Sequence, residues 1–411
     1  MPKEVSFFLF LPDRHLPLLL SFVASLSAAA LGRATEDAAR DDVQVAAYYF
    51  PNWGPENVSE WAPVKRAQPR FEGHAQPKVP VWGYQDETDP AVMAQKIAVA
   101  ADHGVDAFIF CWYYYNEDES GLAGGAWDGS KYLYQALEAG FMAAPNNDQI
   151  QFGIMWCNHN LGDKVKGAVT PETFEQLTDY VIEHYFKHPS YWKINGCPYF
   201  SIYEVNTFLD TFGGDWAAAS AALERFREKT KAAGFPGLHL NGVVWGIGNA
   251  DPDGTVTALG LDSLTSYVWI HHYALPDFPA TDYQKVADAY FDAVENGGGA
   301  NGLGQAVKNL SAPYHPNVSM GWDSSPRCPP DADWMNERGY PFGAIITDNT
   351  PERFRDALVR ARQLAMSLPA DNRIITINAW NEWGEGSYLE PDTVHDMGYL
   401  EAVKSVFGPG E

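Results

Sequence analysis

The sequence predicts an α/β fold, a (β/α)8 TIM barrel with enlarged loops between its strands and helices. Three observations lead to this expectation. Short apolar runs alternate with helical stretches, eight such runs follow residue 42, and no glycine-rich phosphate-binding loop comes after the first of them. A doubly wound open sheet is the alternative arrangement, and it ordinarily carries such a loop.

The eight predicted strands are short apolar runs, many of them rich in β-branched or aromatic residues. Such runs are typical of parallel strands that are buried on both faces. They lie at residues 43–49, 107–112, 151–156, 198–202, 238–244, 263–267, 318–322 and 374–379.

The helix predicted between the first two strands has clear start and stop signals. Asp89 can cap its N-terminus, and Pro90 suits its first turn. Met93 and Ile97 recur on one face, and Gly104 follows as a stop signal. Comparable patterns predict helices at residues 170–185, 215–233 and 350–368, and a weaker one at residues 282–295.

The N-terminus is predicted to lie outside the barrel. Residues 1–34 contain two apolar runs and end in small residues, which is typical of a secretory signal peptide, and residues 35–42 form a short acidic linker. The catalytic domain would then span residues 43–411. We expect export to the periplasm or beyond, with no stable membrane insertion after cleavage; a retained membrane anchor is the alternative.

Composition and charge exclude some classes of partner. The chain of 411 residues has 53 acidic and 28 basic side chains, and its net charge is −25. Such acidity disfavours contact with a phosphate backbone, so we expect no nucleic acid partner. The four cysteines fit no zinc-binding spacing, and we predict no metal and no cofactor. The oligomeric state is left open.

Aromatic and hydrogen-bonding side chains follow the predicted strands. Because catalytic groups of a (β/α)8 barrel lie at the carboxyl ends of its strands, these side chains should surround one mouth. Flat aromatic surfaces with a few polar groups suit a carbohydrate. The residues expected to bind substrate after the first seven strands are Tyr48, Trp53, Trp112, Trp156, Asn158, Tyr203, Tyr267, Trp322 and Asp323.

The strongest signal follows the eighth strand, in the segment Asn378-Ala-Trp-Asn-Glu-Trp-Gly-Glu-Gly-Ser-Tyr-Leu-Glu-Pro-Asp392. Carboxyl groups among indole rings experience a low dielectric, so at least one should keep its proton near neutral pH. Such a pair suits cleavage of a glycosidic bond, and we predict Glu382 and Glu385 as the catalytic residues. Further substrate-binding residues expected here are Trp380, Asn381, Trp383, Tyr388 and Glu390.

A structural role is the alternative for this segment. Asn381 and Glu382 could cap a helix, and Glu385 could be a solvated carboxylate at a helix start. Helix caps do not call for several large aromatic residues so close together. Catalysis is therefore the favoured interpretation.

These motifs resemble the WbsX-type proteins, a glycoside hydrolase family 99-like group that is related to the endo-α-mannosidases. The resemblance covers roughly residues 43–405. It is carried by the segment after the eighth strand, and by weaker matches at residues 48–51, Trp61, residues 73–77 and Trp322-Asp323. It implies a (β/α)8 barrel with its active site at the C-terminal face.

The resemblance also implies roles for the two glutamates. In the endo-α-mannosidases the catalytic pair lies in an Asn-Glu-Trp-Xaa-Glu-Gly segment, which matches Glu382 and Glu385 here. Glu382 would deprotonate the 2-hydroxyl of the sugar, which attacks the anomeric carbon to give a 1,2-anhydro sugar. Glu385 would protonate the departing oxygen and then activate water. An ordinary two-carboxylate displacement is also compatible with this spacing.

Two positions depart from the resemblance. His159 stands where WbsX-type sequences often have a glutamate, and Gly384 replaces a bulkier polar residue of the endo-mannosidases, which predicts a wider subsite. The leading interpretation is an exported glycoside hydrolase that cleaves an α-linked, mannose-like polysaccharide or oligosaccharide with retention of configuration. The alternatives are a glycosyltransferase of surface-polysaccharide biosynthesis and a non-catalytic carbohydrate-binding barrel.

Overall fold

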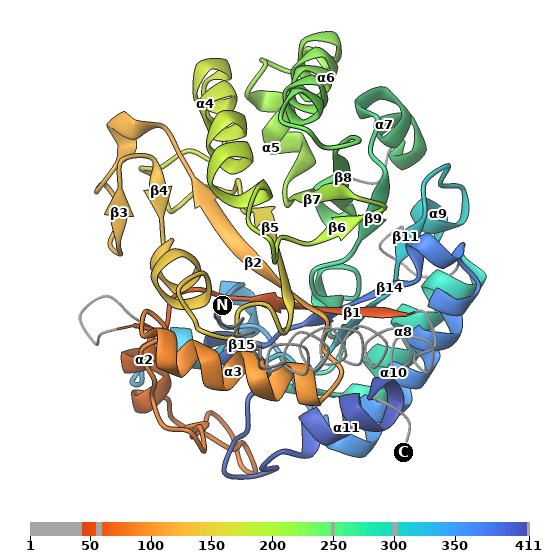
Figure 1. Ribbon diagram of the computed structural model, residues 1–411. Helices are drawn as coiled ribbons and strands as arrows, with labels where there is room; N and C mark the ends of the chain where they lie inside the picture. The colour runs from red at the N-terminus through yellow and green to blue at the C-terminus, as the bar shows by residue number, and fades with distance from the viewer. Residues whose placement is uncertain (1–42, 55–59, 248–250, 298–302, 409–411) are drawn as a thin grey trace, which may run out of the picture. The chain divides into compact units, whose positions relative to one another are not determined.

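The computed structural model describes residues 43–54, 60–247, 251–297 and 303–408. In these residues parallel strands form a nearly closed barrel, and helices pack around its outside (Figure 1). The α/β barrel expected from the sequence is therefore confirmed. The predicted signal peptide (1–34) and acidic linker (35–42) lie outside the described residues.

The barrel strands are hydrogen-bonded in the order β11-β9-β8-β7-β5-β2-β1-β14-β12, and neighbours are parallel. Only Pro316 separates β11 from β12, so the two ends of this order meet in one chain segment. The strands are β1 (Gln44–Tyr49), β2 (Ala107–Tyr114), β5 (Gln151–Trp156), β7 (Cys197–Ile202), β8 (His239–Val243), β9 (Ser263–Thr265), β11 (Tyr314–His315), β12 (Asn317–Ser319) and β14 (Ile374–Asn378).

Helices and short strands make up the remaining elements of the described residues. The helices are α2 (Trp61–Arg66), α3 (Pro90–Asp102), α4 (Pro171–Val181), α5 (Val205–Asp210), α6 (Trp216–Ala232), α7 (Pro252–Leu259), α8 (Tyr283–Asn296), α9 (Leu303–Lys308), α10 (Pro351–Met366) and α11 (Gly398–Phe407). The short strands are β3 (Trp127–Asp128), β4 (Lys131–Tyr132), β6 (Lys193–Ile194), β10 (Ala280–Asp282), β13 (Ile345–Thr347), β15 (Asn381–Glu382) and β16 (Ser387–Tyr388). The short helical turns are η1 (Glu117–Glu119), η2 (Ala136–Phe141), η3 (Ile182–Phe186), η4 (Val244–Ile247), η5 (Trp269–His271), η6 (Ser325–Arg327), η7 (Asn336–Arg338), η8 (Ala370–Asn372) and η9 (Trp383–Glu385).

Each predicted strand overlaps a barrel strand, but the bounds of one prediction are wrong. We expected the seventh strand at residues 318–322, whereas the barrel segment runs from β11 through Pro316 to the end of β12. Beyond β12 the chain leaves the barrel: the carbonyl of Trp322 accepts from Ile346, 2.8 Å away, and the N–H of Asp323 donates to the carbonyl of Glu385 at 2.6 Å. The apolar pattern hid this departure because the leaving segment is still buried.

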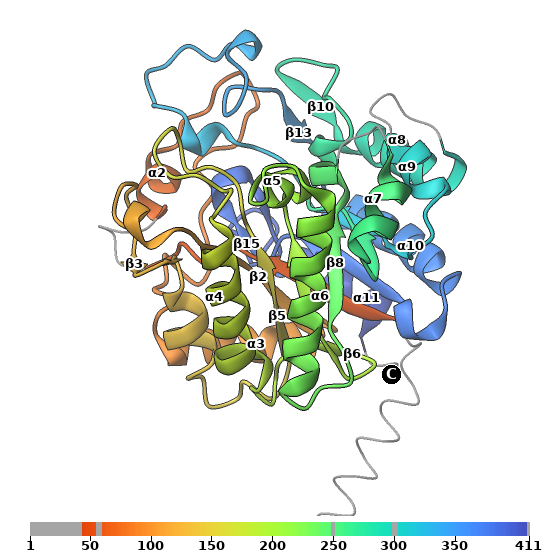
Figure 2. The same cartoon turned by 90° about the horizontal axis from the view of Figure 1, so that it is seen from above.

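The predicted helices are confirmed, and their start signals act as N-caps. Asp89 accepts a hydrogen bond from the N–H of Ala91 at 2.8 Å. Side chains of the same kind cap the other predicted helices, at Thr170, Asp215, Asp282 and Thr350. Because the barrel strands are parallel, the loops after the strands gather at one mouth. Figure 2 shows β10 and β13 apart from the barrel strands.

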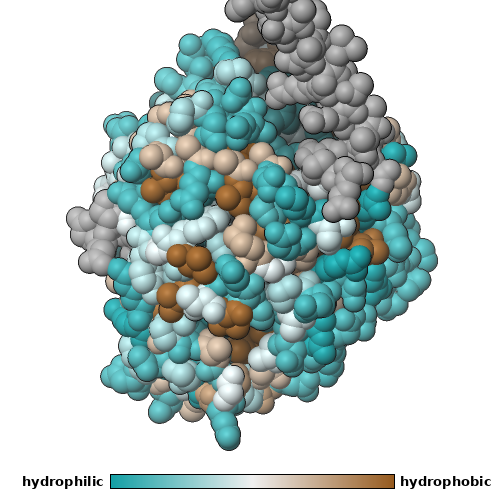
Figure 3. All heavy atoms as spheres, turned by 60° about the horizontal axis from the view of Figure 1, so that its bottom comes forward, coloured by the Kyte–Doolittle hydropathy of each residue, from teal (hydrophilic) through white to brown (hydrophobic). Residues whose placement is uncertain are grey.

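Figure 3 shows one face of the molecule. The face in Figure 3 is mainly hydrophilic, with hydrophobic side chains in small, separate groups. Scattered apolar groups of this kind are normal on a folded protein. Within the described ranges, no helix combines the length and apolar character that spanning a membrane requires.

A buried ionic cluster joins α3 to the segment that follows β14. The ammonium of Lys96 lies 2.6 Å from Glu87 and also contacts Glu390, and all three side chains are buried. Glu390 accepts the indole N–H of Trp380 at 2.9 Å and that of Trp383 at 2.7 Å. Burial raises the pKa of Glu87, although Lys96 opposes that shift. The cluster therefore fixes two tryptophans of the predicted catalytic segment.

Replacing Lys96 by methionine should destabilise the fold strongly. The change leaves Glu87 and Glu390 buried without a cation, which costs about 3–5 kcal/mol when one partner of a buried ion pair is removed. Urea unfolding followed by tryptophan fluorescence measures the loss. The matched control is Lys187→Met, which removes a half-exposed lysine that contacts Glu183. Adding Glu87→Gln to Lys96→Met should recover part of the stability, and equal stability of Lys96→Met and Lys187→Met would contradict a stabilising role for the buried cation.

Candidate active site

The carboxyl ends of the barrel strands open into a cavity of about 550 Å³. Every strand position of the barrel contributes at least one side chain to its wall, so the enlarged loops meet at a single mouth. Side chains in this wall include Phe50, Cys111, Tyr113, Met155, Cys157, His159, Tyr203, Glu204, Trp245, Tyr267, His271, Trp322, Arg327, Tyr340, Glu382 and Glu385.

Both carboxyls that the sequence singles out line this cavity. After β14 the chain forms a hairpin in which β15 pairs with β16 around the turn η9. Gly386 ends the turn with a φ of 63°, and a Cβ on it would lie 2.6 Å from the Cβ of Asp323, so glycine is required at this position. The hairpin brings Glu382 and Glu385 within reach of one guanidinium group.

That guanidinium belongs to Arg327, which ends the turn η6. Its Nη2 lies 3.0 Å from Oε1 of Glu382 and 3.1 Å from Oε2 of Glu60. Its Nε lies 3.5 Å from Oε1 of Glu385. Three carboxyl groups therefore share one cation.

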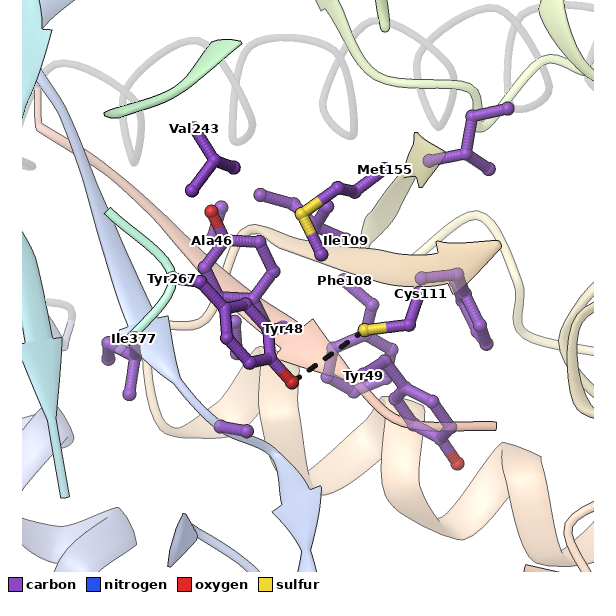
Figure 4. Packing of buried hydrophobic residues seen from close by; sticks show 14 of the residues in the cluster. Ala46, Tyr48, Tyr49, Phe108, Ile109, Cys111, Met155, Val243, Tyr267 and Ile377 are labelled. Atoms are coloured by element: carbon purple, nitrogen blue, oxygen red, sulfur yellow. Dashed lines mark hydrogen bonds between the residues drawn. The ribbon is translucent and has the colours of Figure 1, made fainter. Parts of the chain in front are cut away.

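Each carboxyl of the pair also has its own phenol. Tyr267 donates to Oε2 of Glu382 at 3.3 Å, and Tyr340 donates to Oε1 of Glu385 at 2.8 Å. The Tyr267 hydroxyl lies 3.8 Å from Sγ of Cys111, as the dashed line in Figure 4 marks. These contacts hold the two carboxyls in different hydrogen-bonding environments.

Burial is the main influence on the acidity of the pair. It raises the pKa of Glu382 well above its ordinary value, and the neighbouring Glu385 raises it further, while Arg327 lowers it. Burial also raises the pKa of Glu385, against the opposing effects of Arg327 and of the hydrogen bond from Tyr340. Two interacting acids titrate together. The pair is suited to hold one proton near neutral pH, as a general acid and a base require.

Three of the predicted substrate-binding residues line the same cavity. They are Tyr203, Tyr267 and Trp322. The rings of Tyr203 and Tyr267 meet edge to face with their centroids 5.5 Å apart. The ring of Trp322 lies 6.3 Å from that of Tyr340. These rings provide aromatic surface on two sides of the glutamate pair.

Other predicted substrate-binding residues lie in β2 and β5 or just after β5, but they face away from the cavity. Trp112 donates to the hydroxyl of Tyr185 at 3.1 Å, and the ring of Trp156 lies 5.7 Å from that of Phe174 on α4. Asn158 is buried against the main chain of Glu204. Because side chains alternate along a strand, their sequence neighbours take the inward positions. Those neighbours are Cys111, Tyr113, Cys157 and His159.

The residues predicted within the final hairpin lie beneath the cavity wall, except for the two glutamates. Trp380 and Trp383 donate to Glu390, and Tyr388 stacks on Trp383 with ring centroids 3.7 Å apart. Asn381 exchanges two hydrogen bonds with the main chain of Phe50, at 2.7 and 2.9 Å. Direct contact of these buried side chains with a substrate stays a prediction.

Two predicted residues from the end of β1 are also displaced from the cavity. Tyr48 is buried inside the barrel, where its ring lies 4.8 Å from that of Tyr267. Trp53 packs against Trp61, with 4.2 Å between ring centroids, and borders a separate cavity of about 350 Å³. Their contact with a sugar is likewise untested.

Asp323 supports the turn that carries the cation. Its Oδ2 lies 2.9 Å from Nε2 of His74 and accepts from the amide of Gln76 at 2.6 Å, while its Oδ1 accepts the N–H of Ser325 at 3.1 Å. Burial raises the pKa of Asp323, but its interactions with His74 and Ser325 outweigh that effect and lower the pKa. The sequence motifs at residues 73–77 and at Trp322-Asp323 therefore meet in one contact.

The prediction that Gly384 widens a subsite is wrong. A Cβ on Gly384 would lie 2.7 Å from Oε2 of Glu60 and 3.2 Å from the guanidinium of Arg327. The ion pair occupies the space that the missing side chain leaves. Gly384 admits this ion pair and does not enlarge the cavity.

Sequence reasoning missed Arg327, Glu60 and Tyr340. Each lies in a long loop, and none belongs to a recognisable motif. One signal could have found Arg327: buried carboxyl groups ordinarily have a cation near them, and Arg327 follows the seventh strand closely. Glu60 and Tyr340 offered no comparable signal.

The cavity wall holds no evident metal site. Within the described ranges, no group of three or more His, Cys, Asp or Glu side chains could hold a metal ion. Burial lowers the pKa of His271 to about 3 and that of His272 to about 4, so both rings are neutral at physiological pH. The uncharged ring of His271 packs in the aromatic wall of the cavity, where it stacks on Trp245.

Solved glycoside hydrolases share this fold. The family 99 endo-α-mannosidase of Bacteroides thetaiotaomicron, bound to bis-tris propane, has a TM-score of 0.55 at 14% identity, and the match covers 90% of this chain and 97% of that one. Another structure of that enzyme has a TM-score of 0.51 at 16% identity, covering 89% and 96%. A protein described as glycoside hydrolase-like has a TM-score of 0.59 at 14% identity, covering 90% and 95%. The TM-scores show a likeness of fold, and at these sequence identities the comparison shows the fold alone.

The sequence itself matches curated relatives and a family. Uncharacterized protein WxcX from two strains of Xanthomonas campestris pv. campestris is 26% identical over 381 residues, which is 88% of this chain and 49% of the relative. This chain thus spans about half the length of the curated relatives that it matches. The family described as glycosyltransferase WbsX matches residues 51–403. Since that match takes in most of the barrel and both glutamates of the hairpin, the chain belongs to the WbsX family.

Proposed function

We propose that this chain is an exported glycoside hydrolase that cleaves α-linked, mannose-like glycans with retention of configuration. One observation carries the proposal: Glu382 and Glu385 line the same cavity at the barrel mouth and share Arg327. Tyr203 and Trp322 add the flat surfaces on which sugar rings stack. The likeness of fold to endo-α-mannosidases supports the choice of an α-linked, mannose-like substrate.

In the proposed reaction Glu382 is the base and Glu385 the acid. This assignment follows the resemblance of the Asn381–Gly386 segment to that of the endo-α-mannosidases. Arg327 lies 3.0 Å from Glu382 and 3.5 Å from Glu385, so it can stabilise an anion on either carboxyl. Glu382 takes the proton of the 2-hydroxyl while that oxygen bonds to the anomeric carbon, and Glu385 protonates the departing glycosidic oxygen. Glu385 then takes a proton from water, whose oxygen opens the 1,2-anhydro sugar, and Glu382 returns its proton to the 2-oxygen.

Glycosyl transfer is the second candidate, and the description of the family favours it. A sugar hydroxyl would then open the same intermediate in place of water, with Glu385 as its base. The shared Arg327 is surrounded by three carboxyls, which disfavours the diphosphate of a nucleotide sugar. Export would separate the chain from cytoplasmic donors as well. The mass of the mature N-terminus, measured on protein recovered outside the cytoplasm, tests export.

Product analysis tests the proposed function directly. The chain without residues 1–34 is incubated with α-mannans and other surface polysaccharides, and the products are followed by mass and by NMR of the anomeric proton. We expect free sugars that first appear with retained configuration. Products joined to an added acceptor sugar would favour transfer, and inverted products would exclude the 1,2-anhydro step. Absence of any product from the whole panel would contradict the proposal.

Glu382→Gln and Glu385→Gln should each abolish turnover without unfolding the protein. Removing a general acid or base slows a reaction on the order of 10²–10⁴-fold. The change is isosteric, so both variants should keep the thermal midpoint of the parent within a few degrees. The control Glu224→Gln alters an exposed glutamate on α6 and should keep full activity. Activity at the level of this control in both site variants would exclude the assigned roles.

The pH profile of kcat/KM should be bell-shaped, with both limbs above pH 4.5. Activity requires an ionised base and a protonated acid, so it is lost as the pH falls through the lower pKa and as it rises through the higher one. Both glutamates have a pKa raised above the ordinary value of 4.5. Arg327→Met should move both limbs to higher pH, because the cation lowers both pKa values. Arg225→Met, at a half-exposed ion pair with Glu175, is the control. If the pH profile of Arg327→Met is the same as that of the parent, Arg327 does not lower the pKa values of the two glutamates.

A further inference from the structure

The part of the cavity wall that follows β7, β8 and β9 carries a second group of polar and aromatic side chains. Going round the barrel, β7 is four strand positions from β14 in either direction, so its carboxyl end lies across the mouth from the catalytic hairpin. Glu204 follows β7, Trp245 follows β8, and His271 follows β9. All three line the catalytic cavity. None of them belongs to the ion-pair network of Arg327.

Glu204 is held firmly, but no cation of the described residues neutralises it. The side chain of Asn158 forms two hydrogen bonds with the main chain of Glu204: it donates to the carbonyl at 2.7 Å and accepts from the N–H at 2.8 Å. The half-buried carboxylate of Glu204 accepts from the hydroxyl of Thr207 at 2.5 Å, and no lysine or arginine of the described ranges pairs with it. A fixed carboxylate with free acceptor positions in a cavity is available to a ligand hydroxyl.

Trp245 provides an exposed flat surface beside this carboxylate. Its side chain is 42% exposed, unlike most of the tryptophans in the barrel. Its ring stacks on His271, with centroids 4.6 Å apart and planes at 25°, and lies 5.8 Å from the ring of Tyr203. The Nδ1 atom of His271 is buried and has no hydrogen-bond partner among the described residues. An indole supported in this way presents an apolar face next to polar groups, which suits a sugar ring.

We propose that Glu204, Trp245 and His271 form a second sugar subsite in the catalytic cavity, which binds an uncharged sugar ring. The ring stacks on Trp245 and donates a hydroxyl proton to Glu204. An acidic sugar is excluded because the carboxylate of Glu204 lacks a neutralising cation. This inference rests on the proposed function in one respect: the ring belongs to the glycan whose scissile bond lies at Glu382 and Glu385.

Calorimetric binding and hydrolysis of α-mannobiose and α-mannotetraose by the full chain test the subsite. Glu204→Ala and Trp245→Ala should each weaken binding of α-mannotetraose by about tenfold or more, which is the usual scale for a hydrogen bond to a charged group or an aromatic contact. The loss should be smaller for α-mannobiose, which is too short to fill the whole cavity. The matched controls are Glu228→Ala and Trp216→Ala, which remove exposed residues of α6. Oligogalacturonate should not bind the parent.

The outcomes separate the subsite from the proposed function. Hydrolysis with unchanged affinity in Glu204→Ala and Trp245→Ala would overturn the subsite and leave the hydrolase standing. Binding that both variants weaken, without any hydrolysis by the parent, would support the subsite and overturn the hydrolase. If oligogalacturonate binds as tightly as α-mannotetraose, the subsite is not restricted to uncharged sugar rings, and that part of the proposal is wrong. No binding of either mannose oligosaccharide would overturn both proposals.

Discussion

The ion pairs of Lys96 with Glu87 and Glu390 hold the candidate active site to the barrel. One ammonium joins a helix outside the barrel to the hairpin after the last strand, and Glu87 also accepts the amide of Asn381 at 3.0 Å. Asn381 in turn fixes the main chain of Phe50 at the end of β1. Buried charges stabilise a fold only when every partner is satisfied. Here the satisfied network fixes the position of the hairpin, and the hairpin fixes the positions of Glu382 and Glu385.

In the cavity, as beneath the hairpin, carboxyl groups outnumber the cation that pairs with them. Beneath the hairpin one lysine serves two carboxyls, whereas in the cavity Arg327 serves Glu60, Glu382 and Glu385. Burial, together with the excess of carboxyls, raises the pKa values of Glu382 and Glu385. A single cation holds the carboxyls together without ionising both of them fully. An acid and a base can then coexist at one pH.

The sequence predicts the fold well because the signals of the fold are local. Strands such as β1, β2 and β5 are apolar runs, and caps such as Asp89 and Thr170 mark where helices begin. It predicts far less well which side chains enter the cavity. A barrel strand is buried on both faces, by the interior on one side and by helices on the other, so apolar character does not distinguish inward from outward. We preferred the large rings of Trp112 and Trp156, and both face the helices.

The sequence singles out the two glutamates that line the cavity, whereas it gives no sign of their electrostatic surroundings. Glu382 and Glu385 stand in one short motif, but Glu60 is 267 residues from Arg327 along the chain, and Arg327 is 55 residues from Glu382. No local pattern reveals contacts between such distant loops. Yet these contacts tune the pKa values on which acid and base chemistry depends. Glu204 is likewise not marked by a motif in the sequence around it. It lies across the mouth from the glutamate pair only because the strands form a barrel. The motif therefore identifies the two glutamates, and contacts between distant loops determine their acidity.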